Sequence, residues 1–200
     1  MSTTATVTQT PTGSSSGPAQ VLSVSKSASH GVSKSPVGEI TLIAGLGASG
    51  DCHAGKTVQH RAIQQKTPSV TNNRQVHIVS IETLRDVSSR GKITPPLSAG
   101  MIGENITTQG LDLVSLPCGT ELHFVGPSSK AVVVLTGLRA PGPGIDQVRP
   151  NLLPHFTFRD GSQVKKMAGV MGIVKSGGEV KPGMHIEVVR PAAARSLPFV

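Results

Sequence analysis

The stretch from Gly50 to Arg61, GDCHAGKTVQHR, gathers an unusual number of reactive side-chain types in a short span. The flanking Gly50 and the internal Gly55 disfavour a helix. Such a set could hold a metal ion, pair a nucleophile with its base, or cradle an anion, and a solvated polar loop is the fourth possibility. The stretch contains one acid, one thiol, two imidazoles and two further cations: Asp51, Cys52, His53, Lys56, His60 and Arg61.

A metal site and a nucleophilic pair both require side chains that converge. Zinc takes three or four thiolate, imidazole or carboxylate ligands. Cys52 and His53 are adjacent, and neighbours in an extended chain point to opposite faces. Only His53 and His60 are expected to converge, and the other cysteine, Cys118, is far along the chain. We therefore expect no metal site here and no nucleophile built from Cys52.

An anion cradle agrees better with the residue types. Backbone N–H groups beside glycines, and the side chains of Lys56, His60 and Arg61, are all hydrogen-bond donors. Further polar residues stand at the ends of predicted strands, where rigid turns commonly present a binding site. These are Arg74, Glu104, Asn105 and Arg139, the last followed by a turn with Pro141 and Pro143.

The elements that must position these residues are short. Alternating or apolar runs predict strands over 21–27, 39–47, 74–81, 103–110, 119–126 and 131–138, and two strands around a Gly177–Gly178 turn within 169–189. One helix is predicted after Ser80, its N-cap, with Glu82 in the first turn and Gly91 at its end. We expect a mostly β fold with a minor α part, a β-barrel of about eight short, mainly antiparallel strands with few short helices.

Composition divides the chain into one domain with two tails. Residues 1–19 are rich in Ser and Thr and predict a disordered tail, 20–190 form the domain, and 191–200 predict a C-terminal tail. Two cysteines without a CxxC pair indicate a reducing compartment. No membrane-length apolar run or signal sequence is present, so we expect a cytoplasmic protein. A mitochondrial location is expected less, because the first 25 residues lack Lys and Arg.

The net charge of +8 suggests an anionic partner. The Lys and Arg residues of the chain are scattered along the sequence, which argues against a polybasic arm. The chain has no Trp or Tyr and only four Phe, so it lacks the aromatic platform usual for single-stranded nucleic acids. We expect neither a nucleic acid nor a membrane as the partner, but an anionic small molecule.

Five blocks of the sequence, in order, resemble those of the MOSC domain. They are GLGASGDCHAG followed by HR, RQVHIVSIE, AGMIGENITTQGLDLVSLPCGTEL, VLTGLRAPGPGID and KKMAGVMGIVKSGGEVKPGMHIEVV. This domain occurs at the C-terminus of molybdenum cofactor sulfurases, in amidoxime-reducing proteins and as free-standing proteins, and the chain resembles the stand-alone form. The resemblance covers about 21–189, nearly all of the predicted domain.

The resemblance implies a MOSC-type β-barrel with a pocket for the molybdenum cofactor, a pterin dithiolene with a terminal phosphate. Members carry or transfer sulfur on that cofactor or use it to reduce N-hydroxylated compounds, with a redox partner protein where reduction occurs. Pyridoxal phosphate is not expected, because it belongs to a separate domain of the sulfurases. The implied cofactor-binding residues are Asp51, His53, His60 and Arg61 in the first motif, Arg74 in the second, Glu104 and Asn105 in the third, and Arg139 in the fourth, and Lys56 joins them from the basic loop.

One departure from the family pattern puts the chemistry in doubt. After the Thr-Gly-Leu-Arg turn the family has Asn-Pro-Cys, whereas this chain has Ala140-Pro141-Gly142. Gly142 has no side chain to act as the soft thiolate ligand or sulfur carrier. Ser49 also replaces the usual Glu of the first motif. Two hypotheses stay open: an active cofactor enzyme in which another thiol (Cys52 or Cys118) or no thiol serves, and a catalytically impaired cofactor-binding protein. The catalytic residue stays unassigned.

Overall fold

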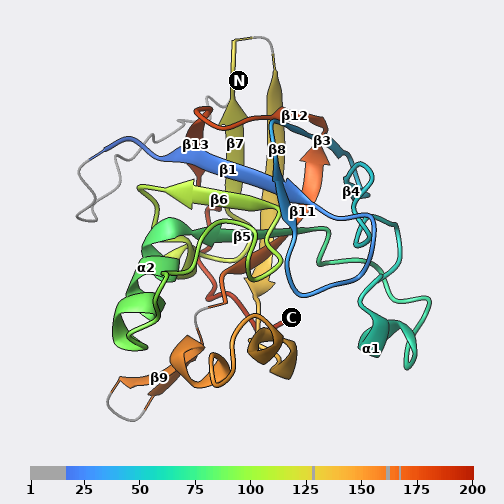
Figure 1. The fold of residues 1–200 in the computed structure, drawn as a ribbon. Helices are drawn as coiled ribbons and strands as arrows, with labels where there is room; N and C mark the ends of the chain where they lie inside the picture. Colours follow the sequence, from blue (N-terminus) through green and yellow to red (C-terminus); the bar gives the residue numbers. More distant parts are fainter. Residues whose placement is uncertain (1–16, 128, 161–162, 167) are drawn as a thin grey trace, which may run out of the picture.

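The computed structural model describes residues 17–127, 129–160, 163–166 and 168–200. Seven strands close into a barrel in the order β13-β7-β8-β11-β5-β6-β1, with β1 and β13 joining its ends, and β2 adds to β1 outside the ring (Figure 1). Only β5 and β6 pair in parallel within this sheet. The expected mostly β, mainly antiparallel barrel is confirmed. Its strands are β1 (Gln20–Lys26), β2 (Ser35–Val37), β5 (Val76–Ser80), β6 (Ile106–Gln109), β7 (Glu121–Val125), β8 (Lys130–Leu138), β11 (Val170–Ser176) and β13 (His185–Val189).

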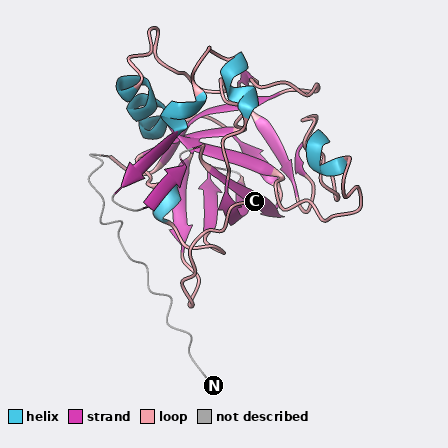
Figure 2. Cartoon of the chain, turned by 90° about the horizontal axis from the view of Figure 1, so that it is seen from below, coloured by secondary structure: helices cyan, strands magenta, loops and turns pink. Residues whose placement is uncertain are grey.

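Smaller elements surround the barrel, and Figure 2 shows the short helices at its periphery. A three-stranded sheet and a hairpin lie beside it. The sheet consists of β3 (Ile40–Ile43), β4 (Gly47–Ala48) and β12 (Gly178–Val180), and the hairpin of β9 (Thr157–Asp160) and β10 (Gln163–Lys166). The helical elements are α1 (Arg61–Gln64), α2 (Ile81–Arg90) and the 3₁₀ turns Leu113–Ser115, Pro143–Gln147 and Leu153–Phe156.

The helix α2 has the boundaries that its end signals predict. The Ser80 hydroxyl accepts a hydrogen bond from the backbone N–H of Thr83 at 3.2 Å, which satisfies one of the unpaired donors of the first turn. Gly91 caps the other end. The apolar side of α2 is buried in a second hydrophobic cluster that includes Leu84 and Val87.

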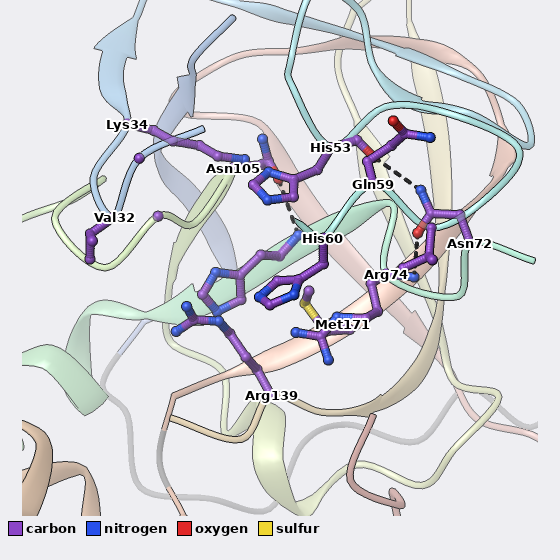
Figure 3. Close-up of a pocket in the computed structure, with 14 residues that line it drawn as sticks. Val32, Lys34, His53, Gln59, His60, Asn72, Arg74, Asn105, Arg139 and Met171 are labelled. Atoms are coloured by element: carbon purple, nitrogen blue, oxygen red, sulfur yellow. Dashed lines mark hydrogen bonds between the residues drawn. The ribbon is translucent and has the colours of Figure 1, made fainter. Parts of the chain in front are cut away.

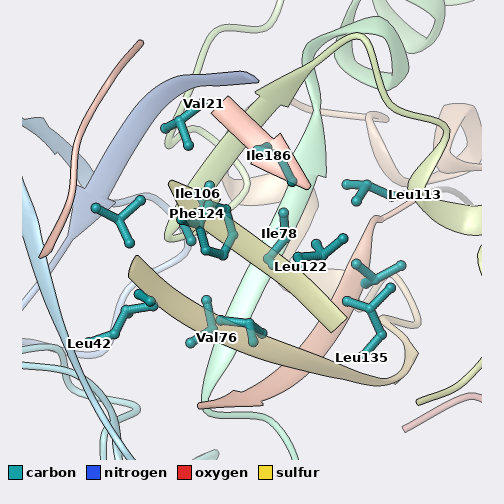
Figure 4. Close-up of a cluster of buried hydrophobic side chains, with 14 of the residues drawn as sticks. Val21, Leu42, Val76, Ile78, Ile106, Leu113, Leu122, Phe124, Leu135 and Ile186 are labelled. Atoms are coloured by element: carbon teal, nitrogen blue, oxygen red, sulfur yellow. The ribbon is translucent and has the colours of Figure 1, made fainter. Parts of the chain in front are cut away.

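The main core fills the barrel interior (Figure 4). Because the chain is poor in aromatic residues, Val, Ile and Leu supply most of the buried surface, and Phe124 is the large central side chain. Other fully buried members are Val76, Ile78, Ile106, Leu122 and Leu135.

The predicted pair of strands around Gly177–Gly178 is wrong. The chain does not reverse into a hairpin there: β11 pairs with β5 and β8, whereas the following β12 pairs with β3 in another sheet. A Cβ on Gly177 would lie 2.8 Å from the Leu42 carbonyl oxygen. Glycine at this position therefore permits the close approach of β3 rather than a tight turn.

Both domain boundaries lie further out than composition predicts. Ala19 is buried, and its carbonyl accepts a hydrogen bond from Ile186 N at 2.9 Å. Most of the predicted N-terminal tail lies outside the described residues. At the other end Leu197 is buried in the core, and Leu138 N donates to the Pro198 carbonyl at 2.7 Å. The segment 191–200 thus packs against the barrel and is not a detached tail. None of the helices in the described part of the chain has the length and apolar character needed to cross a membrane.

Candidate functional site

A pocket with a cavity volume of about 100 Å³ opens where several strand ends and loops meet (Figure 3). Its walls come from the loop between β1 and β2, the loop that contains the opening motif, the segment that leads into β5 with the start of that strand, the segment before β6, the exit of β8 and the strand β11. The polar lining residues are Lys34, His53, Gln59, His60, Asn72, Arg74, His77, Asn105 and Arg139.

Two arginines in this pocket have buried donors that no group in the described part of the chain satisfies. Arg74 Nε and Arg139 Nη1 are buried atoms without a hydrogen-bond partner among the described residues. Burial lowers the pKa of both guanidinium groups, that of Arg139 to about 10, and the charge of Arg74 adds to the effect on Arg139. Both remain charged at neutral pH. A buried, unpaired cation donor is costly, so this pair is suited to an anion that enters from solvent.

Two histidines beside the arginines have lowered pKa values. Burial lowers the pKa of His60, and the positive charge of Arg74 lowers it further. His77 lies on β5, and its Nε2 is 2.6 Å from the Ala168 carbonyl, to which the Nε2–H donates. Burial holds the pKa of His77 well below its ordinary value, and the charge of Arg139 acts in the same direction. The pocket therefore combines charged guanidinium groups with two imidazoles, those of His60 and His77, whose protonation is disfavoured.

Asp51 organises one wall of the pocket from behind. Its carboxylate is buried and accepts hydrogen bonds from Lys34 Nζ at 2.9 Å, Asn105 Nδ2 at 3.0 Å and His53 N at 3.0 Å. Burial alone would raise the pKa of Asp51, but the His53 hydrogen bonds and the Lys34 charge hold it well below its usual range. Burial lowers the pKa of Lys34, and the charge of Asp51 opposes this shift. The pair stays ionised, and Asp51 positions three lining residues without lining the pocket.

Glu104 also acts behind the wall. Its buried carboxylate accepts hydrogen bonds from Gly100 N at 2.6 Å, Ile102 N at 3.3 Å and Thr107 Oγ1 at 3.1 Å. Burial raises the pKa of this carboxyl above its ordinary value, although these hydrogen bonds oppose the shift. Glu104 fixes the turn before β6 and so places the adjacent Asn105 in the pocket.

The predicted site residues thus fall into three groups. His53, His60, Arg74, Asn105 and Arg139 line the pocket. Lys56 and Arg61 are exposed and outside the lining set, and Asp51 and Glu104 are buried behind it.

Several lining residues give little sign in the sequence. Lys34 stands in a Ser-rich segment without a motif, and only the fold brings it to Asp51. Gln59 and Asn72 are ordinary loop residues by type. His77 is different, because a histidine within the apolar run of β5 is a polar residue at a buried position. That mismatch could have identified His77 from the sequence.

The expectation that Cys52 and His53 point to opposite faces is wrong. Cys52 Sγ lies 3.2 Å from His53 Nδ1. The chain turns here instead of extending, since Ala54 N donates to the Asp51 carbonyl at 3.1 Å. The other cysteine, Cys118, directs its Sγ at backbone carbonyls, with that of Thr136 at 3.6 Å.

Gly142 is the residue before the 3₁₀ turn Pro143–Gln147 and is not among the lining residues. Its neighbourhood is close to the pocket, since a Cβ on Gly144 would lie 3.6 Å from Val32, which does line it. A Cβ on Gly142 itself would meet no atom within 4 Å. The position of the family cysteine thus has room for a side chain, but Gly142 offers no functional group there.

The low pKa of His77 predicts a loss of stability in mild acid. Because the folded state binds this proton less well than the unfolded state, stability is fully present above the unfolded pKa of about 6.5 and falls as pH decreases from there towards the folded pKa. The expected slope from this one group is about 1.4 kcal/mol per pH unit. Urea unfolding between pH 7.5 and 5 measures it.

The matched variant is His77→Gln, whose amide can still donate to Ala168. This variant should show a shallower acid slope than the native chain. An unchanged slope would mean that His77 is protonated as easily in the folded state as in the unfolded state.

Comparisons with known proteins agree with this architecture. The model of the MOSC domain family matches residues 52–187. Among solved structures, the YuaD protein from Bacillus subtilis superposes with a TM-score of 0.68 at 23% identity, over 85% of this chain and 94% of that chain. YiiM from Geobacillus stearothermophilus superposes with a TM-score of 0.56 at 18% identity, over 90% of this chain and 80% of that chain. The comparison with curated proteins found no match. The family match spans more than half of the sequence, so the chain belongs to the MOSC domain family.

Proposed function

We propose that the pocket binds the molybdenum cofactor through its terminal phosphate. The observation that carries this proposal is the pair of buried, unpaired donors Arg74 Nε and Arg139 Nη1. Guanidinium groups bind phosphate oxygens with strong, charge-assisted hydrogen bonds. The association of the MOSC family with this cofactor supports the choice of ligand.

The donor set fits the phosphate end of the cofactor better than the whole group. A cavity of about 100 Å³ has room for a phosphate but is well below the roughly 300–1,000 Å³ of pockets that enclose a complete small molecule. The positive net charge of +8 also favours the approach of an anion.

Each part of the wall has a distinct role in this proposal. Arg74 and Arg139 hold the anion, and His77 keeps the pocket polar without adding charge. Lys34, fixed by its bond to Asp51, supplies a further positive charge at the pocket wall. The bound cofactor would supply the chemistry of sulfur transfer or of reduction of N-hydroxylated compounds. Reduction would additionally require an electron-donating partner protein.

A second candidate function follows from Gly142. Because the chain offers no thiol at the position of the family cysteine, it lacks the side chain that would act there as metal ligand or sulfur carrier. A catalytically impaired protein that binds the cofactor without turnover is therefore the alternative. Both candidates require the same anion pocket and differ only in activity.

The test measures molybdenum and phosphate separately. Protein from a cofactor-competent host should contain molybdenum by mass spectrometry, and Arg74→Gln should contain less. Added inorganic phosphate should raise the thermal midpoint of the native chain, since a ligand that binds only the folded state stabilises it. No molybdenum together with no effect of phosphate would overturn the proposal, whereas activity on N-hydroxylated substrates would decide between the two candidates.

Introducing the missing thiol should increase cofactor retention. Gly142→Cys places its Cβ in open space at φ −108°, so the free energy of unfolding should change by less than about 0.5 kcal/mol. The new thiolate should keep more molybdenum on the protein through gel filtration. Gly142→Ser is the control of equal size, and equal retention by both variants would show that no metal–sulfur bond forms. High native activity that Cys52→Ser abolishes would instead show that Cys52 performs this role.

A further inference from the structure

One cluster of potential metal ligands lies at the edge of the anion pocket. His30, Cys52 and His53 each offer one ligand atom, and these three atoms lie within 4.8 Å of one another. It is the one group of three or more His, Cys or carboxylate residues that meets this spacing within the described ranges. The cluster joins the loop after β1 to the opening motif.

We propose that His30, Cys52 and His53 bind a divalent zinc ion. Thiolate and imidazole are the ligands that zinc prefers, at about 2.3 Å for sulfur and 2.0–2.1 Å for nitrogen. Tetrahedral angles with these lengths separate sulfur and nitrogen by about 3.6 Å. Cys52 Sγ and His53 Nδ1 are 3.2 Å apart, so a small outward shift of these side chains admits the ion.

A neighbouring carbonyl already orients the imidazole of His30. His30 Nε2 lies 2.8 Å from the Gln59 carbonyl oxygen, and donation of its proton leaves Nδ1 as the nitrogen with a free lone pair. Such an outer hydrogen bond is usual for histidines that ligate metals. The two rings meet edge to face, with centroids 5.2 Å apart and planes at 66°, so they are not stacked against each other.

The local charge is compatible with a bound dication. The thiolate of Cys52 offsets one of the two charges of the ion, and the carboxylate of Asp51, whose Oδ1 is 3.4 Å from His53 Nδ1, is shared between the ion and Lys34. Lys34 opposes the cation but is itself paired with Asp51 at 2.8 Å. Burial raises the pKa of the Cys52 thiol, and the charge of Asp51 acts in the same direction, so the metal must displace the thiol proton.

Three protein ligands leave a tetrahedral zinc ion with one open position. His53, a member of the cluster, and Gln59, which contacts His30, also line the anion pocket. The cluster therefore lies beside a pocket that attracts anions. The zinc site does not depend on the proposed cofactor, and the two can be tested independently.

Cobalt(II) is the probe, because it substitutes for zinc and reports thiolate ligation by absorbance. Titration of the purified full chain should give one equivalent of bound Co²⁺ with a thiolate-to-cobalt charge-transfer band, and one equivalent of Zn²⁺ should remove that band. Cys52→Ser should abolish the band, and His30→Gln should weaken Co²⁺ binding at least tenfold. Cys118→Ser, which removes the other thiol, should leave the spectrum unchanged.

Far-ultraviolet circular dichroism checks that each variant is folded. If Cys52→Ser does not fold, His30→Gln is the variant that decides. Absence of the band in the native chain, or its persistence in a folded Cys52→Ser, would overturn the proposal. Equal Co²⁺ affinity of His30→Gln and the native chain would also overturn it. Arg139→Gln should keep the band while losing phosphate binding, which separates failure of the zinc site from failure of the anion pocket.

Discussion

Asp51→Asn is expected to lower the free energy of unfolding by about 3–5 kcal/mol. The side chains of Lys34 and Asp51 are 3% and 1% exposed, and their charged atoms lie 2.8 Å apart. Neutralising the carboxylate leaves the Lys34 ammonium buried without a counter-charge, and the desolvation penalty of that cation then acts in full. The hydrogen bonds from Ser27 N and Asn105 Nδ2 to the carboxylate weaken in addition.

Urea unfolding followed by circular dichroism measures this loss, since the chain has no Trp or Tyr for fluorescence. Glu187→Gln is the control, because its ion pair with Lys130 is about half exposed on both sides and should contribute less than about 1 kcal/mol. The double variant Lys34→Met/Asp51→Asn should lose less than the sum of the two single losses, because it leaves no unpaired buried charge. A loss for Asp51→Asn as small as that of the control would show that water reaches Lys34.

Local signals in the sequence predict the elements whose boundaries depend on neighbouring residues. Ser80 and Gly91 delimit α2, and alternation of apolar residues identifies strands such as β7. Arg74 and Arg139 are predicted at strand ends, and they meet because β5 and β8 both pair with β11. That pairing is a property of the closed barrel. The residue pattern predicts a barrel as the fold class, but it does not predict which strands are neighbours.

The features that the sequence does not predict depend on contacts that the fold creates, and not on local signals. The route of the chain at Gly177 depends on contact with Leu42, which is remote in the sequence. The convergence of Cys52 with His53 depends on a turn that the Asp51 carbonyl and Ala54 N close. Lys34 lies in the site because it forms a buried ion pair with Asp51. A sequence pattern contains the residue types for these contacts but not the distances.

Arg139→Gln is expected to weaken the binding of inorganic phosphate by about 10- to 150-fold, which corresponds to one charge-assisted hydrogen bond of about 1.5–3 kcal/mol. The same change should stabilise the protein when no anion is present. Burial lowers the pKa of Arg139 to about 10, the charge of Arg74 repels it, and its Nη1 has no partner in the described part of the chain. We expect a gain of about 0.5–2 kcal/mol in the free energy of unfolding.

Opposite signs for binding and stability distinguish a ligand-binding arginine from a structural one. Arg61→Gln is the matched control, because it removes the same charge from an exposed position of the opening motif that does not line the pocket. It should leave both the phosphate affinity and the unfolding free energy nearly unchanged. Equal losses of affinity in the two variants would mean that net charge alone attracts phosphate. A destabilised Arg139→Gln with native phosphate affinity would mean that Arg139 supports the barrel. A ligand-binding arginine is expected to lower the free energy of unfolding of the ligand-free protein, because its buried donor gains a partner only when the anion binds.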